Sequence, residues 1–246
     1  MTLERMIALQ GAVNFRDLGG YETADGRHTR WRVLFRADGL GELTPDDYAI
    51  LRELDIRTVV DLRSAGELEN GRFDVDSHPV AFHHFPFMET LPHPEVFERA
   101  PGLLAERYKE MLDDAGPQIV GALRALSAPD ARPAVFHCTA GKDRTGILSA
   151  LVLLLVGVPE ATVVHDYALS GEAMARLREK IIAKYPDSRE VIETLEETFS
   201  ANPDHMVGLL RHMHEHYGTV EDYVRAKGLD PSVIVRLRDE LLEPAS

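Results

Sequence analysis

The sequence predicts an α/β fold in which a central, mostly parallel sheet is flanked by helices. Three short apolar or β-branched runs, at residues 57–62, 79–87 and 131–136, are typical of strands. Stretches with helical periodicity separate them, and strands that alternate with helices favour a layered α/β domain. From Pro159 onward the pattern is helical almost to the end, so we expect additional C-terminal helices on the same domain.

The first forty residues are rich in glycine and predict turns and short strands, with one strand at Trp31–Phe35. A helix should begin after Thr44, which can cap it. Pro45 suits the first helical position, and the two aspartates that follow favour the positive end of the helix dipole. We expect this helix to end near Leu54.

The middle of the chain alternates between strands and helices. Residues 57–62 and 131–136 predict buried strands and residues 79–87 a weaker one. The helix expected over residues 144–156 is apolar on nearly all sides, which indicates a central position. Two further helices are expected over 94–112 and 117–126.

The helical second half has breaks but no linker. No Pro/Gly/Ser-rich segment divides the chain, so we expect one domain over residues 1–246. The charged, amphipathic segment 171–202 is either a helical lid over the site or a solvated helical face. The breaks are expected near residues 171, 186, 200–203, 218 and 228–231.

Composition limits the partners. The net charge is −14, so the average surface repels nucleic acid, and any anion site must concentrate a few donors. The N-terminus lacks the apolar region of a signal peptide, and the apolar run at 147–158 is too short to span a bilayer. We therefore expect no nucleic-acid partner, no integral membrane segment and a cytoplasmic location, with export by a signal-less route left open. No feature indicates an oligomeric state.

Residues 137–146 (HCTAGKDRTG) place a short loop between a strand and an apolar helix. Inward backbone N–H groups and a helix N-terminus together bind a phosphate dianion. Arg144 can close the ring around the anion with a bidentate contact, and Gly141 allows the backbone to bend. The expected binding residues are His137, Thr139, Ala140, Gly141, Lys142 and Thr145.

Cys138 is the single cysteine, so no intramolecular disulfide can form. Facing a helix N-terminus and nearby cations, its thiol is expected to ionise and act as a nucleophile. Thr145 can donate a hydrogen bond to the sulfur, and His137 is expected to orient the loop rather than act as a base. The alternative is a buried structural cysteine, which leaves the flanking Gly-Lys-Asp-Arg-Thr unexplained.

Other site classes fit the sequence poorly. A nucleotide-binding loop needs glycine where Phe136 stands and Ser or Thr where Asp143 stands. A zinc site at Cys138 lacks a second cysteine. In the run of histidines at 212, 214 and 216 only the first and last share a helical face, so we expect no metal there.

The loop resembles the signature of cysteine-dependent phosphatases, and its Gly-Lys-Asp-Arg form is similar to the bacterial atypical tyrosine phosphatases with dual or triple specificity. Residues 14–20 (NFRDLGG), 59–64 (VVDLRS) and 166–170 (DYALS) resemble further motifs of that family. The resemblance implies a phosphatase-like fold and hydrolysis of phosphotyrosine, phosphoserine/threonine or phosphoinositide substrates through a phosphocysteine. It implies no metal and no cofactor.

The general acid is open between two aspartates. The resemblance indicates Asp143, inside the loop, whereas Asp61 ends a buried strand, where sites in α/β sheets lie. Asp61 can instead be a structural partner of Arg144 or Arg16. Lys142 is expected to add positive charge at the mouth, unless it is a solvated lysine. Arg16, with its neighbour Asp17, is expected either to line the entrance or to form a structural salt bridge.

Two other functions remain. Residues 61–68 (DLRSAGEL) also resemble a rhodanese-like sulfurtransferase segment, although the Lys-Asp-Arg-Thr-Gly continuation of the cysteine loop argues against that class. A catalytically silent phosphate-binding module is the second alternative, but such proteins usually lose the cysteine, the arginine or the acid. The physiological substrate is not readable from the sequence.

Overall fold

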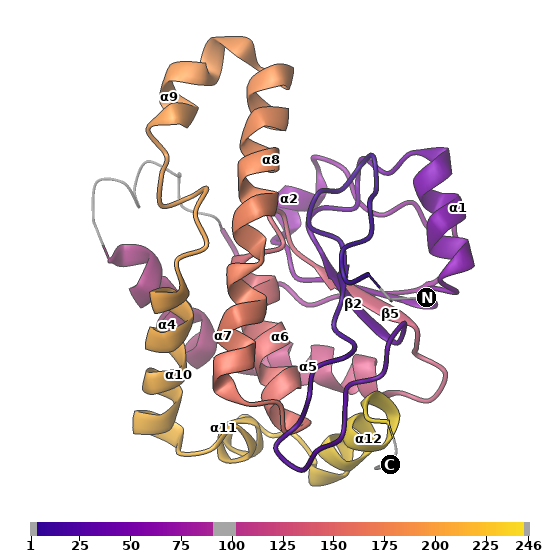
Figure 1. The fold of residues 1–246 in the computed structure, drawn as a ribbon, viewed down its shortest axis with the longest axis vertical. Helices are drawn as coiled ribbons and strands as arrows, with labels where there is room; N and C mark the ends of the chain where they lie inside the picture. The colour runs from indigo at the N-terminus through magenta and orange to yellow at the C-terminus, as the bar shows by residue number, and fades with distance from the viewer. Residues whose placement is uncertain (1–3, 91–101, 244–246) are drawn as a thin grey trace.

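A computed structural model describes residues 4–90 and 102–243. Its centre is a five-stranded sheet with the strand order β1-β2-β5-β3-β4 (Figure 1). Strands β2, β5, β3 and β4 run parallel, and only β1 is antiparallel to its neighbour, so the predicted fold class is confirmed. The strands are β1 (Arg16–Asp17), β2 (Leu34–Ala37), β3 (Thr58–Asp61), β4 (Ala81–His84) and β5 (Ala134–His137).

Helices cover both faces of this sheet. The helices before β5 are α1 (Pro45–Glu53), α2 (Ala65–Leu68), α4 (Leu103–Asp114) and α5 (Gly116–Ser127). Those after it are α6 (Asp143–Leu155), α7 (Glu160–Ala168), α8 (Ser170–Lys184), α9 (Arg189–Glu193), α10 (Pro203–Tyr217), α11 (Val220–Ala226) and α12 (Pro231–Leu241), with a 3-10 turn at Pro186–Ser188.

The alternation of side chains along the strands divides the core in two. Phe35, Val59 and Val135 face one side, where they pack with Tyr48 and Leu51 of α1. Their neighbours in the chain face the larger apolar cluster formed with α4 to α7 and α10 to α12. Helix α6 lies inside this larger cluster, and nearly all its residues are buried, as its all-round apolar pattern predicts.

Most predicted elements appear within a few residues of their expected bounds. Thr44 caps α1 through a capping box, as expected. Strand β2 starts at Leu34 rather than Trp31, because Arg32 has a positive φ and occupies a turn. The break expected near Gly171 is confirmed, since α7 ends at Ala168 and α8 begins at Ser170. Of the helix expected over 94–112, residues 94–101 lie outside the described residues.

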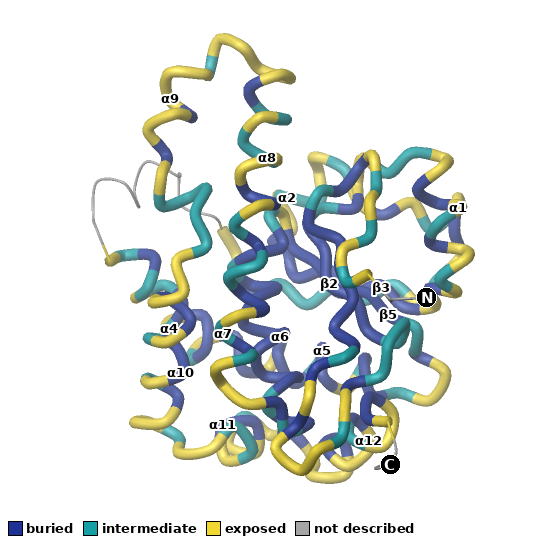
Figure 2. The backbone as a smooth tube through the Cα atoms, in the orientation of Figure 1, coloured by how far each residue is buried: buried dark blue, intermediate teal, exposed yellow. Residues whose placement is uncertain are grey.

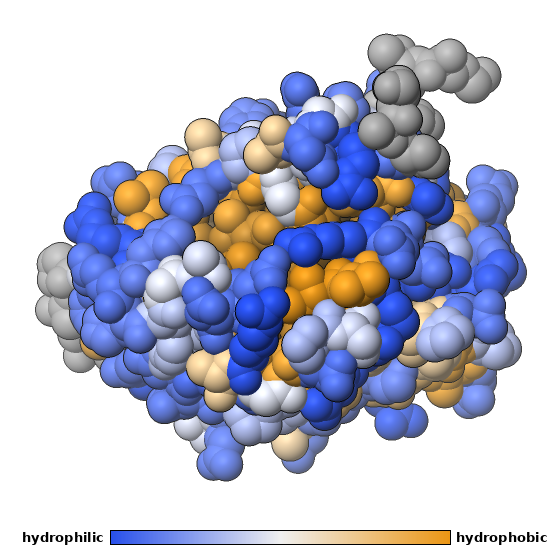
Figure 3. Space-filling model, turned by 90° about the horizontal axis from the view of Figure 1, so that it is seen from below, coloured by the Kyte–Doolittle hydropathy of each residue, from blue (hydrophilic) through white to orange (hydrophobic). Residues whose placement is uncertain are grey.

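Helices α8 and α9 form a hairpin that projects beyond the rest of the molecule (Figure 1). Its tip is largely exposed, whereas every strand except the edge strand β4 is buried (Figure 2). This hairpin corresponds to most of the segment 171–202. Seen from below, the surface is mainly hydrophilic, with apolar side chains visible between polar ones (Figure 3). Within the described residues, no helix is both long and apolar enough to cross a membrane.

Candidate active site

The loop that carries Cys138 leaves the middle strand of the sheet. In the parallel register, His137 at the end of β5 lies beside Ala37 of β2 and Asp61 of β3. The loops that follow these three strands therefore meet at one edge, where ligands bind in open α/β sheets. Cys138 itself is only 1% exposed.

Contacts from three residues outside the loop orient its peptide groups. The carbonyl of Thr139 accepts from the backbone N–H of Gly39 (3.0 Å), and the carbonyl of Ala140 accepts from Nδ2 of Asn14 (3.0 Å). The carbonyl of Gly141 accepts from an η nitrogen of Arg36 (2.7 Å). A trans peptide holds its N–H opposite its carbonyl, so carbonyls fixed outward turn the N–H groups inward and create an anion-binding concavity.

Gly141 is required by this close approach. Its φ is +66°, a left-handed conformation that residues with a Cβ rarely adopt. A Cβ placed there would lie 2.5 Å from the carbonyl oxygen of Ala37. The loop can therefore bend over the end of β2 only with glycine at this position.

A buried ion cluster contacts the loop through Arg36. The carboxylate of Asp166 binds Nε of Arg16 (3.2 Å) and an η nitrogen of Arg36 (2.5 Å), and Tyr21 donates to it as well (2.8 Å). Burial alone would raise the pKa of Asp166, but the two guanidinium groups outweigh it and hold that pKa well below its usual value. Burial lowers the pKa of Arg36 to about 10, which still leaves it charged at neutral pH.

This cluster corrects the role expected for Arg16. The side chain is fully buried, and besides Asp166 it contacts Asn14 and Ser170. Arg16 therefore does not line the entrance and belongs to a structural salt bridge, the alternative that the sequence left open. Asp17 is also buried, and it accepts from the backbone N–H groups of Gly19 and Arg32.

Arg144 lies in the first turn of α6 and is held by a carboxylate from α2's first turn. Its two η nitrogens bind the two oxygens of Glu67 at 2.6 and 2.9 Å. Thr139 also donates to Glu67. Burial would raise the pKa of Glu67, but Arg144 lowers it to about 2. Burial likewise works to lower the pKa of Arg144, but Cys138 and Glu67 raise it overall.

Asp143 lies at the N-terminus of α6 and is partly accessible, with 27% of its side chain exposed. Its Oδ1 accepts a hydrogen bond from the hydroxyl of Tyr108 in α4 (2.5 Å). Asp61 is fully buried and binds Arg63 through its backbone N–H and guanidinium (2.7–3.1 Å). Exposure therefore favours Asp143 as the acid, and the expected pairing of Asp61 with Arg144 or Arg16 is wrong.

Two other loop residues, Lys142 and Thr145, lie differently from expectation, whereas His137 does not. Lys142 is 1% exposed, and its Nζ donates to the carbonyl of Thr198 (2.8 Å), so it is not at an open mouth. Among the described residues, the Oγ1 of Thr145 is buried without a hydrogen-bond partner, so the expected bond to the sulfur is not formed. His137 is buried, and its Nδ1 contacts the carbonyl of Cys138 (3.2 Å). Burial lowers the pKa of His137, which favours the neutral ring.

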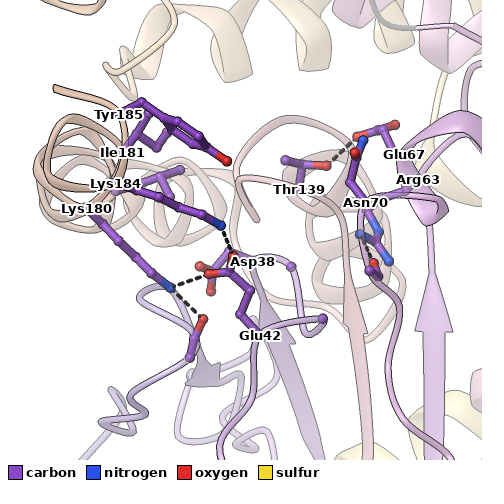
Figure 4. A pocket seen from close by; sticks show the side chains of 15 residues that line it. Asp38, Glu42, Arg63, Glu67, Asn70, Thr139, Lys180, Ile181, Lys184 and Tyr185 are labelled. Atoms are coloured by element: carbon purple, nitrogen blue, oxygen red, sulfur yellow. Dashed lines mark hydrogen bonds and ion pairs between the residues drawn. The ribbon is translucent and has the colours of Figure 1, made fainter. Parts of the chain in front are cut away.

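A cavity of about 410 Å³ opens beside the loop at Thr139 and Glu67 (Figure 4). One wall is formed by α8 and the residue that follows it: Ile181 of the helix and Tyr185, just after its end, point toward the opening in Figure 4. Lys180 and Lys184 of the same helix both bind Glu42 on the facing loop, at 3.1 and 2.5 Å.

No metal-binding cluster is present among residues 4–90 and 102–243. The three histidines of α10 have protein partners instead. His212 contacts Asp113 (2.9 Å) and His214 contacts Glu160 (2.6 Å), while Nδ1 of His216 contacts the carbonyl of His212 (2.9 Å).

Sequence reasoning missed several residues that shape the site. Two of them, Asn14 and Asp166, lie within the quoted family-like motifs at 14–20 and 166–170. The motifs therefore indicated that these residues matter, but not which contacts they make. Glu67 is a capping-box residue of α2. No pattern in the sequence indicates Arg36 or Tyr108 as contacts of the loop.

Comparisons with known sequences agree on one family. The sequence model described as the tyrosine phosphatase family matches residues 7–243. The triple specificity protein phosphatase PtpB of Mycobacterium tuberculosis is 30% identical over 95% of this chain and 98% of its own. A tyrosine-protein phosphatase of Nostoc commune is 34% identical over 55% of this chain and 47% of its own. The crystal structure of P. aeruginosa TpbA is 17% identical with a TM-score of 0.39, over 89% of this chain and 94% of that chain.

Proposed function

This chain belongs to the tyrosine phosphatase family, and we propose that it hydrolyses phosphomonoesters through a phosphocysteine formed on Cys138. The observation that carries the proposal is the set of outward-held carbonyls at Thr139, Ala140 and Gly141. Together with Arg144, these contacts support an anion site at the loop of Cys138, whose side chain is buried. Family membership does not support the sulfurtransferase alternative, and the presence of the cysteine, the arginine and Asp143 speaks against a silent module.

In the first step the sulfur of Cys138 attacks phosphorus. An S–P bond forms while the P–O bond to the leaving group breaks, and Asp143 gives its proton to the departing oxygen. Charge on the equatorial oxygens is stabilised by the loop N–H groups and by Arg144. Glu67 holds both η nitrogens of that arginine, so Arg144 is oriented before substrate arrives.

In the second step water attacks phosphorus, and the S–P bond breaks. Asp143, now ionised, accepts the proton of the water and is ready for the next cycle. Inorganic phosphate leaves, and the thiolate is restored. No redox partner or metal appears in this balance.

The proposed substrates are phosphotyrosine proteins, with phosphoserine/threonine proteins and phosphoinositides as further candidates. The name of the Mycobacterium tuberculosis relative, a triple specificity phosphatase, supports this breadth. The residues 171–202 are proposed to act as a lid within a single domain, because α8 lines the cavity and the carbonyls of Glu197 and Thr198 cover Lys142.

The test is hydrolysis of p-nitrophenyl phosphate, a phosphotyrosine peptide, a phosphoserine peptide and phosphoinositide vesicles at fixed pH. We expect wild-type turnover of the aryl substrates and none in Cys138→Ser. Rapid acid quenching with a radiolabelled phosphotyrosine peptide should trap label on the wild-type chain alone. Turnover that survives Cys138→Ser would refute the proposal.

A further inference from the structure

The carboxyl group of Asp143 has an asymmetric environment. Its Oδ1 accepts from the hydroxyl of Tyr108 at 2.5 Å and lies 3.6 Å from Nζ of Lys142. Across residues 4–90 and 102–243, no hydrogen bond involves Oδ2. The two oxygens are therefore not equivalent, and only Oδ2 is free to face a substrate.

Tyr108 is suited to hold Oδ1 throughout a catalytic cycle. Its side chain is fully buried, and burial followed by the charge of Asp143 raises the pKa of its hydroxyl well above the usual value. The hydroxyl therefore keeps its proton at any working pH. When Asp143 is ionised, Oδ1 accepts that hydrogen bond as a carboxylate oxygen. When Asp143 carries a proton on Oδ2, Oδ1 is a carbonyl oxygen that still accepts it, although more weakly.

Tyr167 fixes the direction of that donor. The two tyrosine hydroxyls lie 2.7 Å apart, and their rings meet edge to face at 87° with centroids 6.1 Å apart. A hydroxyl has one proton, so a Tyr108 that donates to Asp143 must accept from Tyr167. The result is a chain of hydrogen bonds from Tyr167 through Tyr108 to Asp143.

The residues of this hydrogen-bond chain come from three helices that pack together. Tyr108 comes from α4 and Tyr167 from the end of α7, while Asp143 opens α6. Gly146, on the next turn of α6, makes room for the Tyr167 ring, because a Cβ there would lie 3.0 Å from it. Both phenol rings are thus fixed by packing.

We propose that Tyr108, supported by Tyr167, is a positioning residue that reserves Oδ2 of Asp143 for the proton given to the leaving oxygen. The inference rests on the proposed function of Asp143 as general acid. The proton on Oδ2 passes to the leaving oxygen as the P–O bond breaks, and Oδ1 keeps the hydrogen bond from Tyr108 throughout. Tyr108 itself transfers no proton and touches no substrate.

The test is Tyr108→Phe measured on a series of aryl phosphates whose leaving groups differ in basicity. A misplaced acid matters most when the leaving oxygen is basic. General acid catalysis contributes about 10²–10⁴-fold, and we expect Tyr108→Phe to lose about tenfold in kcat/KM on the most basic leaving group. The most acidic leaving group, which departs without a proton, should lose less than about twofold.

Tyr223→Phe is the matched control. Tyr223 is also fully buried, and its hydroxyl donates to the carbonyl of Leu112 (2.7 Å), in a hydrogen bond that does not include the loop. Thermal unfolding of both variants measures the structural cost of losing a buried hydroxyl. We expect the control to keep the wild-type dependence of kcat/KM on the leaving group, and Tyr167→Phe to lie between wild type and Tyr108→Phe.

The outcomes separate this inference from the proposed function. One outcome is that Asp143→Asn steepens the dependence of kcat/KM on the leaving group while Tyr108→Phe lowers kcat/KM equally for all substrates. In that case the positioning role of Tyr108 is refuted, and Asp143 remains the general acid. If Asp143→Asn keeps the wild-type dependence, the acid assignment itself fails. If Cys138→Ser retains wild-type turnover, the proposed phosphocysteine intermediate is refuted, and the roles proposed for Asp143 and Tyr108 are refuted with it.

Discussion

Two carboxylates in this molecule each bind two cations, and their surroundings differ completely. Asp166 lies between Arg16 and Arg36, and all three side chains are at most 1% exposed. Glu42 lies between Lys180 and Lys184, with all three side chains at least 35% exposed. The first group supports the Cys138 loop through Arg36, and the second joins the α8 helix to the loop across the cavity (Figure 4).

The difference indicates which part of the site is fixed and which can move. Removing one member of a buried ion cluster leaves charges without solvent or partner and is strongly destabilising. Exposed pairs between flexible lysines and a carboxylate contribute little and are screened by salt. We infer that the surroundings of Asp166 hold the loop rigid, whereas α8 can separate from Glu42 at little cost.

The largest effect is expected from Asp166→Asn. The substitution leaves Arg16 and Arg36 buried without a countercharge, and we expect the free energy of unfolding to fall by about 3–5 kcal/mol. Turnover should also be lost, because Arg36 no longer holds the carbonyl of Gly141. Thermal unfolding and a phosphatase assay measure both. If Asp166→Asn were as stable as the wild type, the proposed difference between the buried Asp166 and the exposed Glu42 would be refuted.

Gly141→Ala should mainly affect catalysis. The new Cβ meets the carbonyl of Ala37 and displaces the loop, and a misplacement of about 1 Å at a reacting centre can cost about 10²-fold. Gly26→Ala is the matched control, since Gly26 also has a positive φ (+82°) but has open space around it. Equal losses of kcat/KM in both variants would mean that backbone strain alone, not contact with the end of β2, explains the result.

Glu67→Gln tests the contact that orients Arg144, and its effect depends on pH. The folded state holds the pKa of Glu67 at about 2, below its ordinary 4.5. A lowered carboxyl pKa stabilises the fold fully above pH 4.5, and this contribution is lost as the pH falls toward 2. The stability difference between wild type and Glu67→Gln should therefore be greatest above pH 4.5 and shrink toward pH 2. Denaturant unfolding over this range checks it, and a constant difference would contradict it.

The same variant should lower kcat/KM by about 10- to 150-fold, as expected for the loss of a charge-assisted hydrogen bond worth about 1.5–3 kcal/mol. The loss should be similar for good and poor leaving groups, because in the proposed mechanism Arg144 binds the phosphate and not the leaving oxygen. Glu69→Gln serves as the control, since Glu69 is an exposed neighbour of Glu67. A loss confined to poor leaving groups would assign Glu67 to proton transfer instead.

The smallest effect is expected from Glu42→Gln. Loss of this exposed partner should change the free energy of unfolding by at most about 1 kcal/mol. If α8 must leave Glu42 to admit substrate, kcat/KM should rise by up to about fivefold at low salt, the rate equivalent of ~1 kcal/mol. Added salt should raise the kcat/KM of the wild type toward that of Glu42→Gln, because salt screens the ion pairs of Glu42. A large loss of stability would show that the hairpin is as fixed as the loop.

Contiguous features were predictable from the sequence, because neighbours in the chain are neighbours in the site. The apolar runs identified the buried strands β3 and β5, and residues 137–146 identified the loop. The requirement for Gly141 follows from the need for a tight bend. Such features depend on local geometry alone, which the order of residues determines.

Features that join distant segments were not predictable in the same way. Arg36 and Asp166 are 130 residues apart, and no local pattern pairs them. Arg16 shows the same difficulty, because a charged residue next to a turn is compatible with an entrance or with a buried ion pair. Thr145 follows the loop signature, yet its hydroxyl direction depends on the packing of α6. These outcomes are decided by tertiary burial, which composition and periodicity do not encode.

The contacts of the loop at residues 137–146 have a consequence for the point during synthesis at which the protein becomes active. Cys138 and Arg144 are translated before Asp166, which holds Arg36 and through it the carbonyl of Gly141. The carbonyls that cover Lys142, at residues 197 and 198, are translated later still. A nascent chain therefore contains every reacting group before it contains the support that shapes them, so a ribosome-bound chain that ends before Asp166 should be catalytically silent.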